Sequence, residues 1–152
     1  MKGLELLPLD AGCAVLLAEL HAASFDDSWD AGAIAKLLAL PGAFGWVAAR
    51  DGKPVGFALA RAAAGEAEIL TLGVLAECRR AGIGRRLSAA VLERVRADGG
   101  QRVVLEVAAD NLAALALYRG LGFSSVGVRP DYYLRRDGSR ADARLMSIDF
   151  PS

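Results

Sequence analysis

Apolar residues occur in short blocks separated by turn residues, and the spacing inside each block predicts its secondary structure. Blocks with an apolar residue every three or four positions predict helices at about 11–23, 31–40, 82–97 and 111–121. Continuous or alternating apolar runs predict strands at about 4–9, 43–49, 55–62, 66–75, 102–107, 123–134 and 141–150. Turn pairs such as Asp51-Gly52 and Asp137-Gly138 separate neighbouring strands, so these strands should form antiparallel hairpins.

The stretch from 66 to 107 is arranged differently. A strand-like run is followed by the helical run 82–97 and then by the apolar strand Arg102–Val107, which reads RVVLEV. Strand, helix and strand in this order predict a right-handed crossover between parallel neighbours. Together with the hairpins, this pattern predicts one α/β domain, residues 1–152, built on a mixed sheet.

The composition is typical of one folded domain, since 54% of the 152 residues are hydrophobic and 24% are charged. Because 18 basic residues balance 18 acidic ones, no overall field favours binding to nucleic acid. Two cysteines and one histidine do not suffice for an ordinary structural zinc site, so we expect no metal and no disulfide framework. We find no signal peptide pattern and no apolar run of membrane-spanning length, and we expect a cytoplasmic monomer or homodimer that binds no membrane.

Positive charge is concentrated in the turn Arg79–Arg85, which reads RRAGIGR and opens the helix at 82–97. The first turn of a helix leaves backbone N–H groups unpaired, and the helix dipole adds partial positive charge there. The two glycines let an anion approach that backbone closely. The third glycine of a dinucleotide fingerprint would fall at Leu87, and Gly84 is not followed by the Lys-Ser/Thr of a Walker loop. The turn therefore indicates a pyrophosphate-bearing ligand that is bound in neither of these two ways.

Two polar residues stand out in the segment that follows. Glu106 interrupts the RVVLEV strand near its carboxyl end, where open α/β sheets place their ligands. A carboxylate there must be solvated, paired or chemically active, and a salt bridge to an arginine is the alternative to a catalytic base. Tyr118 follows Asn111 by seven residues, so the two lie on one helix face about 10 Å apart, and a core tyrosine is the alternative to a catalytic acid.

The R-x-x-G-x-G turn and the segment Ala109–Phe123, which reads ADNLAALALYRGLGF, together resemble the GCN5-related N-acetyltransferase (GNAT) superfamily. The resemblance implies a mixed, mostly antiparallel sheet of six or seven strands flanked by about four helices. It also implies acetyl-CoA as co-substrate, with no metal. The pyrophosphate would then be held by Arg79, Arg80, Ala81, Gly82, Ile83, Gly84 and Arg85.

The same resemblance implies that the pantetheine arm lies along Leu72, Gly73 and Val74, where the strand separates from the next one. Gly73 suits a bulge or a close backbone approach. Asn111 would hydrogen-bond the arm, and Tyr118 would lie near the cofactor sulfur.

Leu105-Glu106-Val107, Tyr118 and Asp131-Tyr132-Tyr133 are most similar to one subgroup, the ribosomal-protein-alanine N-acetyltransferase (RimI) type. That similarity implies Glu106 as general base and Tyr118 as general acid, with Glu68 as a reserve base because some superfamily members use that strand. The acceptor would be the N-terminal alanine of a ribosomal protein, contacted by Trp29, Tyr132 and Tyr133.

Two other functions stay open from the residues alone. The same transfer would serve a small amine such as an antibiotic, a polyamine or an amino acid. A non-catalytic acyl-CoA sensor would keep the arginine turn and need neither Glu106 nor Tyr118. Release of thiol from acetyl-CoA in the presence of a peptide that starts with alanine separates the three functions.

Overall fold

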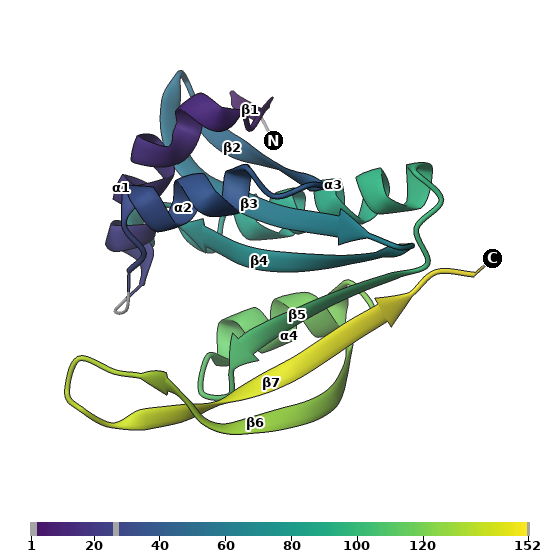
Figure 1. Ribbon diagram of the computed structural model, residues 1–152. Coiled ribbons are helices and arrows are strands. Elements are labelled where there is room, and N and C mark those ends of the chain that lie inside the picture. Colours follow the sequence, from purple (N-terminus) through teal and green to yellow (C-terminus); the bar gives the residue numbers. More distant parts are fainter. Residues whose placement is uncertain (1–2, 26–27, 152) are drawn as a thin grey trace.

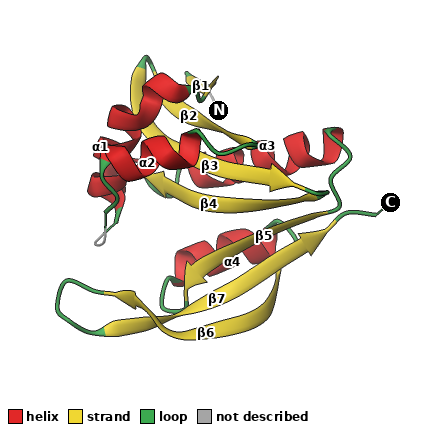
Figure 2. Ribbon diagram, in the orientation of Figure 1, coloured by secondary structure: helices red, strands yellow, loops and turns green. Residues whose placement is uncertain are grey.

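A computed structural model describes residues 3–25 and 28–151, so Asp26 and Asp27, in the loop before Trp29, lie outside the description. Within this part of the chain, seven strands form one sheet in the order β1-β2-β3-β4-β5-β7-β6 (Figure 2). The strands are β1 (Leu4–Pro8), β2 (Ala43–Arg50), β3 (Lys53–Ala63), β4 (Glu66–Val74), β5 (Arg102–Ala108), β6 (Ser124–Leu134) and β7 (Arg140–Asp149). Only β4 and β5 run parallel, which confirms the mixed, mostly antiparallel sheet and the predicted crossover.

Helices pack on both faces of the sheet (Figure 1). The helices are α1 (Ala14–Ser24), α2 (Ala31–Leu38), α3 (Ile83–Ala97) and α4 (Leu112–Gly120), with short 3₁₀ turns η1 (Ala11–Cys13) and η2 (Ala76–Cys78). α1 and α2 pack on one face of β2, β3 and β4, around Leu17, Ile34 and Phe57. α3 and α4 pack on the other face, where the ridge predicted from the sequence is buried: Ile83, Leu87, Val91 and Val95.

Capping side chains start α2 and α4 close to where the sequence predicted them. Asp30 and Asn111 each accept a hydrogen bond from the backbone N–H three residues later, at 2.8 and 3.2 Å, and so begin α2 and α4. Asp10 caps the 3₁₀ turn η1 instead, so the helix expected from residue 11 becomes α-helical only at Ala14.

β4 and β5 are paired over only part of their length, and the last pair is Ile69 with Leu105. Directly after it, the register of β4 with β3 slips at Leu70, which has no partner of its own on β3. Such a bulge bends a strand and increases its twist. β4 then follows β3 as far as Val74 while β5 follows β7, and the two halves of the sheet diverge, as expected (Figure 1).

The divergence leaves backbone groups of β4 facing a gap. Leu75 donates its N–H to the Val55 carbonyl at 2.9 Å, so the backbone groups of Leu75 point toward β3. Successive residues of an antiparallel strand point these groups to alternate sides. The N–H groups of Leu72 and Val74 and the Leu72 carbonyl therefore point away from β3 and into the gap, while the Val74 carbonyl accepts from Arg79 Nε. Leu72 and Val74 are two of the three residues that the family resemblance implies along the pantetheine arm.

Gly73, the third of these residues, lies where a side chain has no room. Its pairing with Phe57 is regular, so the bulge lies at Leu70 and not at Gly73. A Cβ added to Gly73 would lie 2.9 Å from Phe57 Cε1 and 3.0 Å from Ser24 Cβ. Glycine is needed here because α1 approaches β4 closely.

Gly73→Ala should lower the free energy of unfolding by about 1–3 kcal/mol, because the added methyl group has no room unless α1 or the Phe57 ring moves. Gly120→Ala, at the exposed end of α4, is the matched control, since its Cβ would meet only Arg85 Nη1 at an ordinary 3.5 Å. Urea unfolding of both variants beside the wild type measures the difference. Equal stability of all three proteins would contradict the close packing of α1 on β4.

Candidate functional site

The turn before α3 presents backbone donors. Gly82 is the N-cap of the helix in the left-handed conformation, with φ of 81° and ψ of 9°, and no side chain caps it. The first hydrogen bond of the helix runs from Arg86 N–H to the Gly82 carbonyl at 3.0 Å. The N–H groups of Ile83, Gly84 and Arg85 precede that bond and have no acceptor among the described residues. A helix N-terminus of this kind binds phosphate groups.

The arginines of the turn have different surroundings. Arg80 and Arg85 are exposed, and Arg80 adds a second positive φ of 65° to the turn. Arg79 instead donates through Nε to the Val74 carbonyl at 3.1 Å and through Nη2 to the Ser24 carbonyl at 3.5 Å. Arg79 thus holds the turn against the end of β4 and against α1, and its contact with a ligand stays a prediction.

The same turn lies beside the gap between β4 and β5. A Cβ added to Gly84 would lie 3.4 Å from Leu117 Cδ2 and 3.8 Å from Val74 Cγ2, so the start of α3 adjoins both α4 and β4. Ile83 is buried beneath it, and Ala81 is partly buried against the same core. The open N–H groups of α3 and the open backbone of β4 therefore belong to one end of the sheet.

Glu106 lies on the face of β5 opposite α3 and α4, because its neighbours Leu105 and Val107 are buried in the core under those helices. Its Oε1 is 2.9 Å from Nη2 of Arg129, a β6 residue to which no sequence pattern points. Its Oε2 is buried and has no hydrogen-bond partner among the described residues. The salt bridge considered from the sequence is therefore present, but it satisfies only one of the two oxygens.

Two further titratable side chains respond to the charge of Glu106. Burial raises the pKa of Glu68 on β4, and the Glu106 carboxylate raises it further, while Arg129 acts in the opposite direction. Burial, and then the Glu106 charge, raise the pKa of Tyr133 on β6 to about 12. The base and the reserve base expected from the sequence therefore lie in one cluster, with Tyr133 beside them.

Tyr118 enters the site from the opposite face of the sheet, on α4, and is 6% exposed. Burial raises the pKa of Tyr118 to about 12, the hydroxyl of Ser88 acts in the opposite direction, and Tyr133 adds a smaller increase. Ser88 is fully buried on α3 and donates to the Gly84 carbonyl at 2.8 Å. The phenol therefore lies near Ser88 of α3, and its raised pKa keeps it protonated at neutral pH. Ser88 is a second neighbour of the candidate site residues that the sequence did not reveal.

Asn111 serves the fold as the N-cap of α4, with Oδ1 accepting from the Ala114 N–H. Its amide N–H₂ group is the part of the side chain that the cap does not use. Hydrogen bonding of Asn111 to a pantetheine arm stays a prediction.

The three aromatic residues expected at the acceptor lie in two places. Tyr132 is 46% exposed and meets Tyr133 edge-on at 5.1 Å, so both belong to the Glu106 cluster. Trp29 stacks on the buried His21 at 4.8 Å, in the layer of α1 and α2. The part of each residue in acceptor binding stays a prediction.

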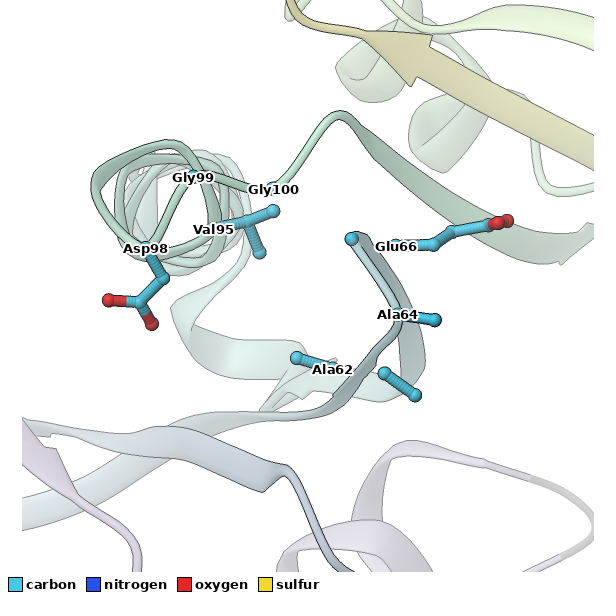
Figure 3. Close-up of a pocket in the computed structure, with 9 residues that line it drawn as sticks. Ala62, Ala64, Glu66, Val95, Asp98, Gly99 and Gly100 are labelled. Atoms are coloured by element: carbon cyan, nitrogen blue, oxygen red, sulfur yellow. The ribbon is translucent and has the colours of Figure 1, made fainter.

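Hollows among the described residues lie away from this gap, at the opposite end of β4 and β5. A hollow of about 210 Å³ lies at the opposite end of β4, between the β3–β4 turn and the end of α3 (Figure 3). Glu66 and Asp98 are its charged lining residues, which does not suit an anionic ligand. Among the described residues, no group of three or more His, Cys, Asp or Glu side chains could hold a metal ion. In the same part of the chain, no helix has the length and apolar character needed to cross a membrane.

Two of the three tyrosines should ionise well above pH 10. Because burial raises the pKa of Tyr118 and Tyr133 to about 12, each keeps its proton at a pH where an ordinary phenol, with a pKa of about 10, has lost it. Folding favours the neutral form, so this contribution to stability is complete below pH 10 and is lost as the pH rises toward 12.

Phenolate absorbance during alkaline titration measures this ionisation. Tyr118→Phe and Tyr133→Phe should each lack one of the late-ionising groups seen in the wild type. Titration of every phenol near pH 10 in the folded protein would contradict the burial of both side chains.

Comparison with known proteins gives consistent matches. The profile of the acetyltransferase (GNAT) family matches residues 14–123. N-alpha-acetyltransferase RimI of Mycobacterium tuberculosis is 44% identical over 142 residues, which cover 90% of this chain and 84% of that protein.

Solved structures agree with this match. The crystal structure of the ribosomal-protein-S18-alanine N-acetyltransferase from Escherichia coli superimposes with a TM-score of 0.91 at 26% identity, covering 98% of this chain and 95% of that one. Arabidopsis thaliana NAA60 in complex with acetyl-CoA gives a TM-score of 0.83 at 21% identity, covering 97% and 98%, and shares the fold. Because the family profile matches more than half of this chain, the chain belongs to the acetyltransferase (GNAT) family.

Proposed function

We propose that the chain transfers the acetyl group of acetyl-CoA to the N-terminal alanine of a ribosomal protein, and that it does so in the cytoplasm, where such acceptors occur. The proposal is supported by the end of pairing between β4 and β5: the open N–H groups of α3 adjoin β4 there, and Glu106, with an oxygen that lacks a donor among the described residues, directly follows the last pair. The similarity to relatives whose names specify N-terminal or alanine acetylation supports the choice of acceptor.

The residues at the gap fit acetyl-CoA. Its diphosphate would accept from the N–H groups of Ile83, Gly84 and Arg85, and the exposed Arg80 and Arg85 side chains would add positive charge. Its pantetheine amides would find the inward-facing N–H groups of Leu72 and Val74, as a peptide does at a sheet edge. When bound, acetyl-CoA supplies the thioester that the acceptor nitrogen attacks.

Glu106 is the base in this reaction. An α-ammonium group has an ordinary pKa of about 7.7–8.0 and must lose a proton before its nitrogen can attack. The Glu106 Oε2 atom, which lacks a donor among the described residues, can accept that proton directly or through a water. We place Glu106 before Glu68 because the unsatisfied oxygen belongs to Glu106.

Tyr118 interacts with the leaving sulfur, but its high pKa makes it a weak proton donor. A phenol with a pKa of about 12 holds its proton at neutral pH. An ordinary thiol has a pKa of about 8.5, so complete transfer of the phenol proton to the thiolate would be unfavourable. We therefore assign Tyr118 as a hydrogen-bond donor that stabilises negative charge while the carbon–sulfur bond breaks. The nitrogen loses a second proton to solvent as the amide forms, and the thiolate takes up one proton from solvent, so one proton is released overall.

The face of the sheet that carries Glu106 favours a peptide acceptor over a small amine held in a closed pocket. α1 and α2 cover β2, β3 and β4, and no described helix covers β5, β7 and β6 on that face (Figure 1). Tyr132, at the edge of this face, is half exposed. A chain terminus can reach Glu106 from this side while the rest of the peptide stays in solvent.

Incubation with acetyl-CoA and a peptide that begins with alanine should release free thiol and add one acetyl group to the peptide N-terminus. The same peptide with a blocked N-terminus is the matched control and should release no thiol. A thiol assay and mass spectrometry measure the two products. Thiol release with small amines but not with the peptide would show that the acceptor is a small amine. Binding of acetyl-CoA without thiol release in the presence of any amine would indicate a sensor.

Three variants test the residues assigned to the reaction. Glu106→Gln should lower kcat on the order of 10²-fold or more, since it removes the base and keeps the shape. Tyr118→Phe should lower kcat on the order of 10- to 100-fold, the effect of one hydrogen bond to developing charge, with little change in affinity for acetyl-CoA. Glu68→Gln should have a smaller effect than Glu106→Gln, and the opposite order would move the base to β4.

A further inference from the structure

Arg129 brings a positive charge to the site from β6, the edge strand. Its Nη2 lies 2.9 Å from Glu106 Oε1, and its Cζ lies 4.7 Å from the centre of the Tyr132 ring. The side chain of Arg129 is 50% exposed, whereas that of Glu106 is 19% exposed. An arginine with an anion at one end and an aromatic ring against its flat face has its orientation defined by both.

The backbone of β6 is irregular where these contacts form. Between Arg129 and Tyr133, β6 advances four residues while its partner β7 advances two. Asp131, inside this irregularity, has a positive φ of 51°, and its N–H donates to Asp142 Oδ1 at 3.0 Å. A non-glycine residue in this conformation costs on the order of 1 kcal/mol or more, so the surrounding contacts must hold it. The irregularity brings Tyr132 under the guanidinium of Arg129.

The ion pair leaves the two oxygens of Glu106 in different states. Oε1 is bound to Arg129, while Oε2 is buried without a donor among the described residues. A buried acceptor without a donor costs about 1–3 kcal/mol, so Oε2 is the atom at which a ligand donor gains most. Arg129 does not occupy this oxygen, and the ion pair therefore orients the carboxylate without blocking it.

We propose that Arg129 is a positioning residue for acetyl transfer: its guanidinium holds Glu106 through Oε1, so that Oε2 is presented to the acceptor ammonium. The inference rests on the proposed function. Lysine at this position would supply the charge but neither the planar fork nor the stacking on Tyr132, so it would replace Arg129 only in part.

Steady-state kinetics with the alanine peptide test this role. Arg129→Gln should lower kcat on the order of tenfold, the effect of losing a hydrogen bond to a charged group, and should leave the affinity for acetyl-CoA unchanged. Arg129→Lys should recover part of the loss. Arg102→Gln is the matched control, because it removes a similar ion pair, Arg102 with Asp149 at 2.6 Å, from the far end of β5 and should keep the wild-type kcat.

A double variant separates positioning from a general structural effect. Since Arg129 acts through the Glu106 carboxylate, Arg129→Gln should cause no further loss of kcat in a Glu106→Gln background. A wild-type kcat in Arg129→Gln, an equal further loss in that background, or a gain in kcat would each overturn the inference. If the wild-type protein acetylates no amine at all, the proposed function fails first, whatever Arg129 does.

Discussion

β4 and β5 stop pairing after Ile69 and Leu105, and the proposed site depends on this early divergence. If the two strands stayed paired, the N–H groups of Leu72 and Val74 would bond to β5, and continuous backbone would separate Glu106 on one face from Tyr118 on the other. The strands diverge after the bulge at Leu70 (Figure 1), and in the proposed function this lets acetyl-CoA at α3 and an acceptor at the uncovered face meet in the plane of the sheet. The proposed site therefore depends on this divergence.

A second consequence is energetic. Folded proteins rarely leave backbone N–H groups or buried carboxylate oxygens without partners, because each such group costs free energy. Among the described residues, no partner is found for the N–H groups at the start of α3, for those of Leu72 and Val74, or for Oε2 of Glu106. These groups lie at one end of the sheet, so ligand binding can recover what folding leaves unsatisfied. The buried Tyr118 adds a proton that stays in place at neutral pH, and fixed donors of this kind stabilise developing charge without reorganisation.

The sequence predicts those parts of the site that follow from local pattern. Gly82 could be placed at the start of a helix after a strand, and Glu106 could be placed near the end of an apolar strand, because both depend on neighbours in the chain. The bulge at Leu70 could not, since strand pairing sets it and no local residue signals it. The contact between Arg129 and Glu106 could not be predicted either. It depends on the strand order β5-β7-β6 and on the irregular register of β6 with β7, and neither is visible in the local sequence. For Arg79, charge and spacing suggested a ligand contact, whereas the folded chain gives it two backbone carbonyls.

Amide hydrogen exchange, resolved to single residues and measured with and without CoA, tests the role of the gap most directly. We expect CoA to slow exchange at the amides of Leu72 and Val74 and at those of Ile83, Gly84 and Arg85, while the exposed Val126 of β6 stays unchanged. Unchanged exchange at the β4 and α3 amides under saturating CoA would contradict a cofactor site between the diverging strands.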